Sequence, residues 1–200
     1  MSDYIELPPP QKELEFPLMR AIEQRRTKRR WDPVELSIQE ISNLLWVACG
    51  VTVKETKRSK SRRTAPSACN TQEIQLYIAL SYGLYRYEGN EHRLKEILSD
   101  DIRGDIGTQK MMKAAPVGLI YVSDFSRFKS FLFKEEKDKW LTAATDTGCI
   151  SENVYLYAAA TGLNTALLGL VNRERLQEIM GLGVHEKVIY TQSIGRALSK

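Results

Sequence analysis

The stretch WLTAATDTGCISENVYLYAAAT, residues 140–161, is the longest segment of the chain that predicts one regular element. It is rich in alanine, the residue with the highest helix propensity, and this composition predicts an α-helix. Gly148 interrupts the pattern only weakly, because a single interior glycine costs about 1 kcal/mol relative to alanine. Gly162 follows directly and is suited to end the helix as a C-cap.

Other segments have the spacing of shorter helices. Ser37 with Glu40 forms a capping-box pattern that predicts a helix start, and Gly50 is suited to end that helix. The apolar face between them is Ile38, Ile41, Leu44, Leu45 and Ala48. Further short helices are predicted around Leu18–Ile22, at Leu94–Leu98 and over Arg173–Met180, the last ending at Gly181.

Short apolar runs predict the strands. These runs are Ile74–Leu80, Leu84–Tyr87 after a turn at Ser81–Gly83, Val117–Val122 as a central buried strand, and Val188–Ile194, with a further apolar run at Asn164–Leu170. Helices and strands are mixed without a regular βαβ repeat. The chain is therefore predicted to be α+β, with a central, mainly antiparallel or mixed sheet flanked by helices.

Some segments carry no clear period. Val51–Thr64 is polar and basic and is predicted to be a loop, whereas Met111 and Met112 are predicted to pack in the core. Phe125–Lys139 mixes Phe128, Phe131 and Phe133 with many charges, which fits either an exposed, partner-facing segment or a mobile loop. Residues 1–16 are predicted to be an extended N-terminal arm, since they include Pro8-Pro9-Pro10. Nothing marks a domain boundary, so residues 1–200 are predicted to be one domain.

Composition excludes several classes of function. The chain has 200 residues, of which 42% are hydrophobic and 27% charged, enough for one domain with a sizeable core. A net charge of +4 is a mild excess, and the basic cluster Lys57–Arg63 lacks aromatic residues that would stack bases, so a nucleic-acid partner is not expected. Three distant cysteines without CxxC spacing predict neither metal site nor disulfide and fit a reducing, cytoplasmic compartment. The N-terminus does not resemble a signal peptide, and no stretch is long enough to span a membrane.

The segment Arg25-Arg26-Thr27-Lys28-Arg29-Arg30 concentrates five cations in six residues. Such charges need water or an anionic partner, because an unpaired buried charge is costly. The arginine fork and the Thr27 hydroxyl suit phosphate oxygens. A solvated basic helix end is the alternative interpretation.

Four segments in order resemble the FMN-dependent nitroreductase family. Arg25-Arg26-Thr27-Lys28-Arg29 is similar to the family's RRSxR element, and Pro66-Ser67-Ala68-Cys69-Asn70-Thr71-Gln72 to its PSxxNxQ loop. Asp146-Thr147-Gly148, Asn153 and Ala158–Leu163 resemble its long central helix. Leu168-Gly169 and the closing Ile194-Gly195-Arg196 resemble its C-terminal features.

This resemblance implies a nitroreductase-like fold in which two subunits form a homodimer, with the long central helix at the interface and FMN bound there by residues of both subunits. The flavin phosphate and ribityl chain would be held by Arg25, Arg26, Thr27, Arg29 and Arg196. The ring would lie beside Pro66, Ser67 and Ala68, with Asn70 on its polar edge and Leu168 and Gly169 near N5. No protein residue is predicted to be catalytic, because the flavin N5 carries the hydride, and NAD(P)H would be the co-substrate.

The resemblance implies an oxidoreductase that passes electrons from NAD(P)H to a small organic acceptor such as a nitroaromatic or a quinone. An azoline dehydrogenase of modified peptides is an alternative, although the adjacent Lys-Tyr pair of those enzymes is absent here. The sequence also fits a non-enzymatic FMN-binding or FMN-sensing protein, or a basic interaction module built on Lys57–Arg63. Locally, Pro66-Ser67 could only start a turn and Asn70 could be an Asx-turn residue. Cys69 is predicted to be a small packed side chain, and the group Phe128–Phe133 could cover the flavin or pack on the other subunit.

Overall fold

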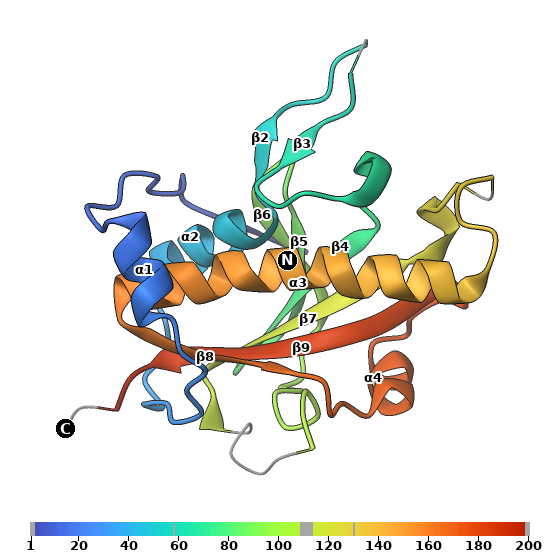
Figure 1. Ribbon diagram of the computed structural model, residues 1–200. Helices are drawn as coiled ribbons and strands as arrows, with labels where there is room; N and C mark the ends of the chain where they lie inside the picture. The colour runs from blue at the N-terminus through green and yellow to red at the C-terminus, as the bar shows by residue number, and fades with distance from the viewer. Residues whose placement is uncertain (1–2, 58, 109–113, 130, 199–200) are drawn as a thin grey trace.

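The structure is a computed structural model that describes residues 3–57, 59–108, 114–129 and 131–198. Its centre is a seven-stranded sheet in which every neighbouring pair is antiparallel, with the order β1-β6-β5-β4-β7-β9-β8 (Figure 1). The strands are β1 (Tyr4–Glu6), β4 (Ile74–Leu80), β5 (Gly83–Glu88), β6 (Arg93–Leu98), β7 (Val117–Asp124), β8 (Leu163–Leu168) and β9 (Glu186–Arg196). The α+β prediction, with a mainly antiparallel sheet flanked by helices, is confirmed.

The middle of the sheet is formed by β4 and β7, whose side chains are buried on both faces. Leu76 pairs with Tyr121 and Tyr77 with Ile120, and all four are almost fully buried. This double burial explains why these two runs are continuously apolar rather than alternating. The predicted strands Ile74–Leu80 and Val117–Val122 are confirmed, the second extending to Asp124.

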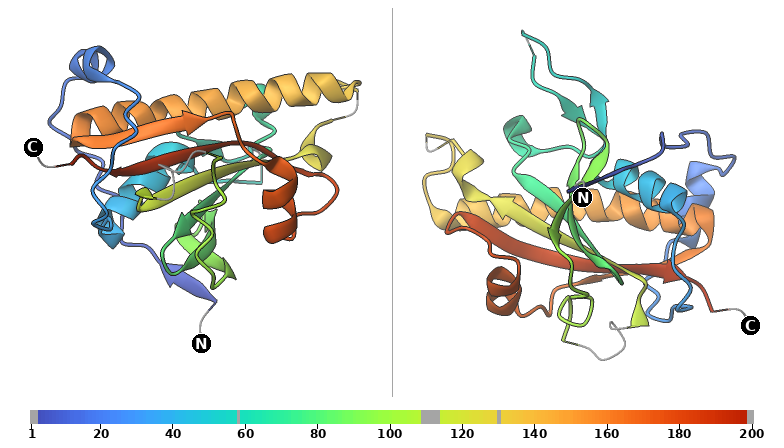
Figure 2. Two further views of the ribbon diagram at one scale, coloured as in Figure 1. Left: turned by 90° about the horizontal axis from the view of Figure 1, so that it is seen from below. Right: turned by 180° about the vertical axis from the view of Figure 1, so that it is seen from behind.

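In the described residues, four α-helices accompany the sheet: α1 (Leu18–Gln24), α2 (Ile38–Cys49), α3 (Glu136–Thr161) and α4 (Arg173–Ile179). The core residues of α2 and α3 join one face of the sheet, and α4 packs on the other face (Figure 2). The predicted capping box at the start of α2 is present, and Gly162 ends α3 in the left-handed conformation at φ 75°. No helix in the described ranges combines the length and the apolar character needed to cross a membrane.

Two sequence predictions are wrong, each because strand pairing overrides the local pattern. Leu94–Leu98 belongs to β6 rather than to a helix, since it pairs with β5 on one side and β1 on the other. The segment Val51–Thr64 contains the hairpin β2 (Val51–Val53) and β3 (Arg62–Arg63) instead of only loop. The predicted extended arm, residues 1–16, contains β1, which pairs with β6 at the edge of the main sheet.

The aromatic segment after β7 is largely packed within the chain. Phe125 begins a short 3₁₀ turn, η3 (Phe125–Arg127), and its ring lies 5.6 Å from that of Phe128, centroid to centroid. Phe128 in turn lies 4.7 Å from Phe133. Phe131 is different, since 68% of it is exposed. The predictions made for Met111 and Met112, and the Arg58 member of the second basic cluster, lie outside the described residues.

Candidate functional site

The basic segment leaves α1 and runs along the free edge of β8. The Lys28 N–H donates to the carbonyl of Thr165 at 3.0 Å, and Thr27 forms a parallel bridge with the same residue. Arg26 turns back to its own helix, because its Nη1 donates to the carbonyls of Glu23 and Arg25, both at 2.8 Å. The edge strand therefore fixes the backbone of the segment, and the Arg26 guanidinium caps the carbonyl groups at the end of α1.

A tyrosine on α3 holds the segment and the strand together. The buried Tyr155 hydroxyl accepts the N–H of Leu167 at 2.9 Å and lies 3.0 Å from the Thr27 hydroxyl. The Arg25 guanidinium lies over the Tyr155 ring, 5.5 Å from its centroid, and 3.8 Å from the Glu152 carboxylate. Sequence reasoning missed Tyr155, whose only signal was its position within the long helix.

Arg29 and the Leu168-Gly169 pair, which the family resemblance assigns to one site, lie close together. Both line a hollow of about 290 Å³, which Gly107, Thr108, Leu167 and Leu170 complete. Arg29 also borders a second hollow with Lys28, Arg30 and Asn164. The structure describes no hydrogen bond or ion pair for the Arg29 side chain with any other described residue. Its guanidinium is therefore available to an anion.

Arg196 pairs with Leu163 at the start of β8, at the opposite end of that strand from Leu168, and its guanidinium is not free. Its carbonyl accepts the N–H of Asp32 at 3.0 Å, and its Nη2 donates to the Glu40 carboxylate at 2.6 Å. Burial raises the pKa of Glu40, but the hydrogen bonds of Ser37 and the charge of Arg196 together outweigh it and lower the pKa. Arg196 lines neither of the two hollows that contain Arg29.

The Pro66–Gln72 loop is held by its own side chains and by α3. Cys69, Asn70 and Gln72 adopt left-handed backbone angles with φ of 52°, 50° and 52°. The Ala68 N–H donates to Asp146 at 2.9 Å, and Asn70 Oδ1 accepts from Gln72 at 2.9 Å. The Asn70 Nδ2 donates to the Ser61 carbonyl at 3.1 Å. Asn70 thus has a local structural role, and Cys69 is exposed, which contradicts the prediction that it is packed.

A buried carboxyl lies directly beneath this loop. Glu73 is 0% exposed, and its Oε2 accepts from the hydroxyls of Thr71 at 2.7 Å and Ser67 at 3.2 Å. Its Oε1 has no hydrogen-bond partner among the described residues. Burial is the largest cause that raises the pKa of Glu73, the Asp146 carboxylate adds to it, and the Thr71 hydroxyl opposes it. Sequence reasoning missed Glu73, although a lone acid immediately before an apolar strand was a visible signal.

Within one chain, the two groups of predicted site residues lie on opposite sides of α3. Asp146 contacts the Ala68 loop, and Tyr155, nine residues later on the same helix, contacts Thr27. Nine residues are two and a half turns, so the two contacts point to opposite faces and are about 13 Å apart along the axis. Figure 1 shows the Pro66–Gln72 loop above α3 and the basic segment below it. One chain brings Arg29 together with Leu168 and Gly169, and Tyr155 links Arg25 and Thr27 to the same strand. Pro66, Ser67, Ala68 and Asn70 are not brought to them.

Comparison with known proteins identifies the family. The model of the nitroreductase family matches residues 22–196, so the chain belongs to the nitroreductase family, a family of oxidoreductases. A protein of Methanocaldococcus jannaschii, provisionally named a nitroreductase, is 25% identical over 99% of this chain and 100% of its own length. The crystal structure of a protein of Ralstonia eutropha, also provisionally named a nitroreductase, superposes with a TM-score of 0.88 at 34% identity, covering 100% of this chain and 91% of that one. The NADPH:FMN oxidoreductase of Vibrio harveyi, solved with NAD⁺, shares the fold, with a TM-score of 0.64 at 15% identity over 91% of this chain and 69% of that one.

Proposed function

We propose that this protein is an FMN-dependent oxidoreductase that takes electrons from NAD(P)H and passes them to a small organic acceptor such as a nitroaromatic or a quinone. The observation that carries the proposal is the hollow in which the free guanidinium of Arg29 faces the Leu168-Gly169 backbone. When bound, FMN would accept a hydride at N5 and deliver electrons to the acceptor. The residues of the chain would bind and orient the FMN and the substrates.

The donor set fits a flavin phosphate. Arg29 supplies a planar fork that no described carboxylate compensates, and Arg25, which is partly exposed, has one ion pair in the described chain, at 3.8 Å to Glu152. If the Tyr155 O–H donates to Thr27, the Thr27 hydroxyl hydrogen is free to bind a phosphate oxygen. Arg26 and Arg196 are weaker candidates, because their guanidiniums already serve carbonyls and Glu40.

The Leu168-Gly169 backbone fits close approach by a flat ring. A Cβ placed on Gly169 would meet only Tyr190, at an ordinary 3.7 Å, so packing within the described chain does not require glycine at this position. Absence of a side chain there leaves the backbone accessible from the hollow. A glycine at this position therefore leaves room for a ligand rather than meeting a packing need of the described fold.

The ring-binding loop would come from a second subunit. Because α3 separates the Arg29 hollow from the Pro66–Asn70 loop, a homodimer that brings the loop of one chain to the hollow of its partner would complete each site. Exposed apolar residues support such a dimer: Leu18 is 63% exposed, Met19 75% and Leu141 71%. Leu18 also borders an apolar groove of about 310 Å³ with Phe16, Trp46, Leu156 and Tyr157.

The first experiment is a visible absorption spectrum of the purified protein saturated with FMN, followed by anaerobic addition of NADPH and of NADH. Bleaching of the flavin bands supports the oxidoreductase, whereas stable bands with both donors favour a protein that binds FMN without turnover. Arg29→Gln should weaken FMN binding about tenfold or more through loss of a charge-assisted contact. Arg62→Gln, on the exposed hairpin, is the matched control and should bind FMN like the parent.

Subunit mixing tests the shared site with the same variant. Arg29→Gln and Asn70→Ala should each lower flavin occupancy when pure. After the two are unfolded and refolded together, heterodimers would carry one site with both groups intact, so about a quarter of all sites should recover. No recovery in a protein shown to be dimeric by light scattering would mean that each chain builds its own site.

A further inference from the structure

A separate cavity opens where two central strands, β4 and β5, separate. The pairing of β4 with β5 runs from Leu80–Gly83 to Tyr77–Arg86 and ends there in the described chain. Beyond that pair, the carbonyl of Ile74 accepts from Nη1 of Arg63 at 2.6 Å, a residue of the β2–β3 hairpin. The space between the strands is a cavity of about 460 Å³. This volume is in the range of small-molecule sites.

Charged side chains dominate the lining of this cavity. Four arginines and two glutamates of the described chain border it, a net charge of +2: Arg63, Arg86, Arg93, Arg127, Glu88 and Glu91. They come from four different parts of the chain, namely β3, β5 with its following turn, β6 and η3. Convergence of guanidiniums from separate elements is not the solvated face of a single helix or strand.

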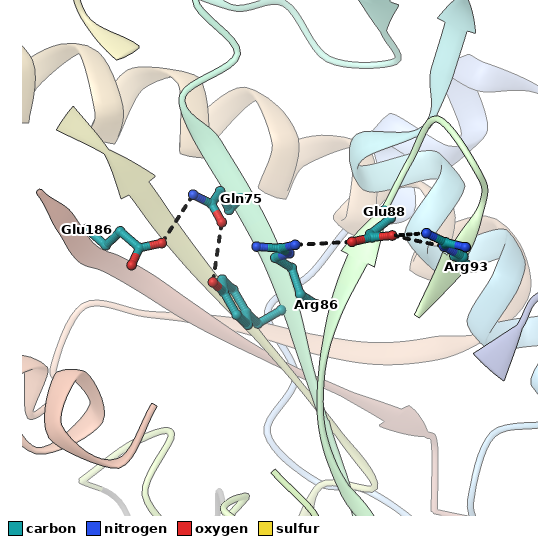
Figure 3. Close-up of polar contacts among 6 residues, drawn as sticks. Gln75, Arg86, Glu88, Arg93 and Glu186 are labelled. Atoms are coloured by element: carbon teal, nitrogen blue, oxygen red, sulfur yellow. Dashed lines mark hydrogen bonds and ion pairs between the residues drawn. The ribbon is translucent and has the colours of Figure 1, made fainter. Parts of the chain in front are cut away.

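The carboxylates do not neutralise the arginines. Glu88 accepts from Arg86 at 3.1 Å and from Arg93 at 2.9 Å, so one carboxylate serves two guanidiniums (Figure 3). Arg93 is fixed further by Tyr4 of β1, over whose ring its guanidinium lies at 3.9 Å. The side chains of Glu88, Arg93 and Arg86 are 17%, 29% and 35% exposed, so this group is partly desolvated and rigid.

The positive charges of two guanidiniums, those of Arg63 and Arg127, are not balanced by a described carboxylate. Arg63 donates to a neutral carbonyl, and neither Arg63 nor Arg127 forms an ion pair with any described carboxylate. Arginines held apart by a scaffold, with free N–H groups, suit the oxygens of phosphate or of a dicarboxylate. The net charge of the lining matches a dianion. The cavity is larger than a bare phosphate needs, and Tyr87, Ile74 and Leu76 add an apolar wall for an organic body.

We infer that the cavity between β4 and β5 is a binding site for a small organic dianion, a phosphomonoester or a dicarboxylate. This site is distinct from the proposed flavin site. Its nearer wall, β4, lies three strand spacings, about 14 Å, from β8, which carries the Arg29 hollow. The inference does not depend on the proposed function, because no residue of the Arg29 hollow lines the cavity.

Calorimetric titration of the FMN-saturated protein with glycerol 3-phosphate and with malonate, at constant ionic strength, tests the inference. Saturable binding of either probe is expected, and which of the two binds more tightly distinguishes a phosphomonoester from a dicarboxylate. Arg127→Gln should weaken binding about tenfold, as should Arg86→Gln. The neighbouring exposed residues provide matched controls, Lys129→Gln and Arg62→Gln, and both should bind like the parent.

The readouts separate this site from the flavin site. Flavin content, measured by absorbance, should be the same in all four variants. Two results would overturn the inference: no saturable heat with either probe, or an unchanged Kd in both Arg127→Gln and Arg86→Gln. If the protein does not hold FMN at all, the same titration on the flavin-free protein, with Arg29→Gln as an added control, still decides the question. Loss of probe binding in Arg29→Gln alone would assign the anion to the other hollow.

Discussion

Removal of one hydroxyl, in Tyr155→Phe, should loosen the basic segment from the rest of the fold. This hydroxyl accepts the Leu167 N–H at 2.9 Å and bonds the Thr27 hydroxyl at 3.0 Å. It therefore joins three parts of the chain, namely α3, the edge of β8 and the segment that follows α1. Phenylalanine keeps the ring beneath the Arg25 guanidinium, so the substitution removes only the two hydrogen bonds.

The expected cost is about 1–2 kcal/mol in the free energy of unfolding. A buried N–H without a partner costs about 1–3 kcal/mol. Leu167 is only half-buried, so water can replace part of the lost bond and the lower half of the range applies. For a chain of 200 residues, this corresponds to a fall in Tm of roughly 2–8 °C. FMN affinity should fall as well, because Thr27 and Arg29 are no longer held in one position.

Urea unfolding at a fixed protein concentration measures the stability change, and quenching of flavin fluorescence measures the FMN Kd. Tyr82→Phe is the matched control, since Tyr82 is 45% exposed and the structure describes no hydrogen bond from its hydroxyl. That variant should stay within about 0.5 kcal/mol of the parent. A Tyr155→Phe protein that matches the Tyr82→Phe control in both measurements would refute the assigned role of the hydroxyl.

Two further substitutions probe the groups around the proposed flavin. Gly169→Ala should leave the free energy of unfolding within about 0.5 kcal/mol of the parent, because its new Cβ meets only Tyr190. The same substitution should weaken FMN binding. A clear loss of stability would show that the fold itself needs this glycine. Glu73→Gln should be more stable than the parent at neutral pH, because burial raises the pKa of Glu73 above its ordinary value of 4.5. Between that value and the folded-state pKa, the unfolded parent ionises while the native parent stays protonated, so the parent loses about 1.4 kcal/mol for each unit by which the pKa is raised. The difference should vanish below about pH 4 in chemical unfolding measured across pH. A difference that is the same at every pH would mean that the pKa of Glu73 is the same in the native and the unfolded protein.

The sequence predicted best where local chemistry decides the structure. Helix α3 forms because of its alanine-rich composition and ends at a glycine that adopts the left-handed angle. The start of α2 was predicted from Ser37 and Glu40, which bond one another without help from distant residues. The strands β4 and β7 were predicted because burial on both faces leaves a continuous apolar run.

The sequence failed where a distant partner decides. The run Arg93–Leu98 has no strict alternation of apolar and polar residues, and it becomes a strand only because it pairs with β5 on one side and β1 on the other. Cys69 was predicted to be packed, but the hydrogen bonds of Asp146 and Gln72 shape its loop and leave the side chain exposed.

For the candidate site, the sequence by itself determined which residue types are available: a dense run of arginines, a Pro-Ser loop and a glycine after the strand of residues 163–168. Only the tertiary structure decided which of them meet. Pairing of Lys28 with Thr165 brings Arg29 beside Gly169. The Ala68 loop lies on the opposite side of α3, because Asp146, which binds it, is two and a half helical turns from Tyr155. The arginines of the β4–β5 cavity are spread from position 63 to position 127, and no local pattern links them. They converge because strand order is set by long-range pairing, which the sequence of any one segment does not encode.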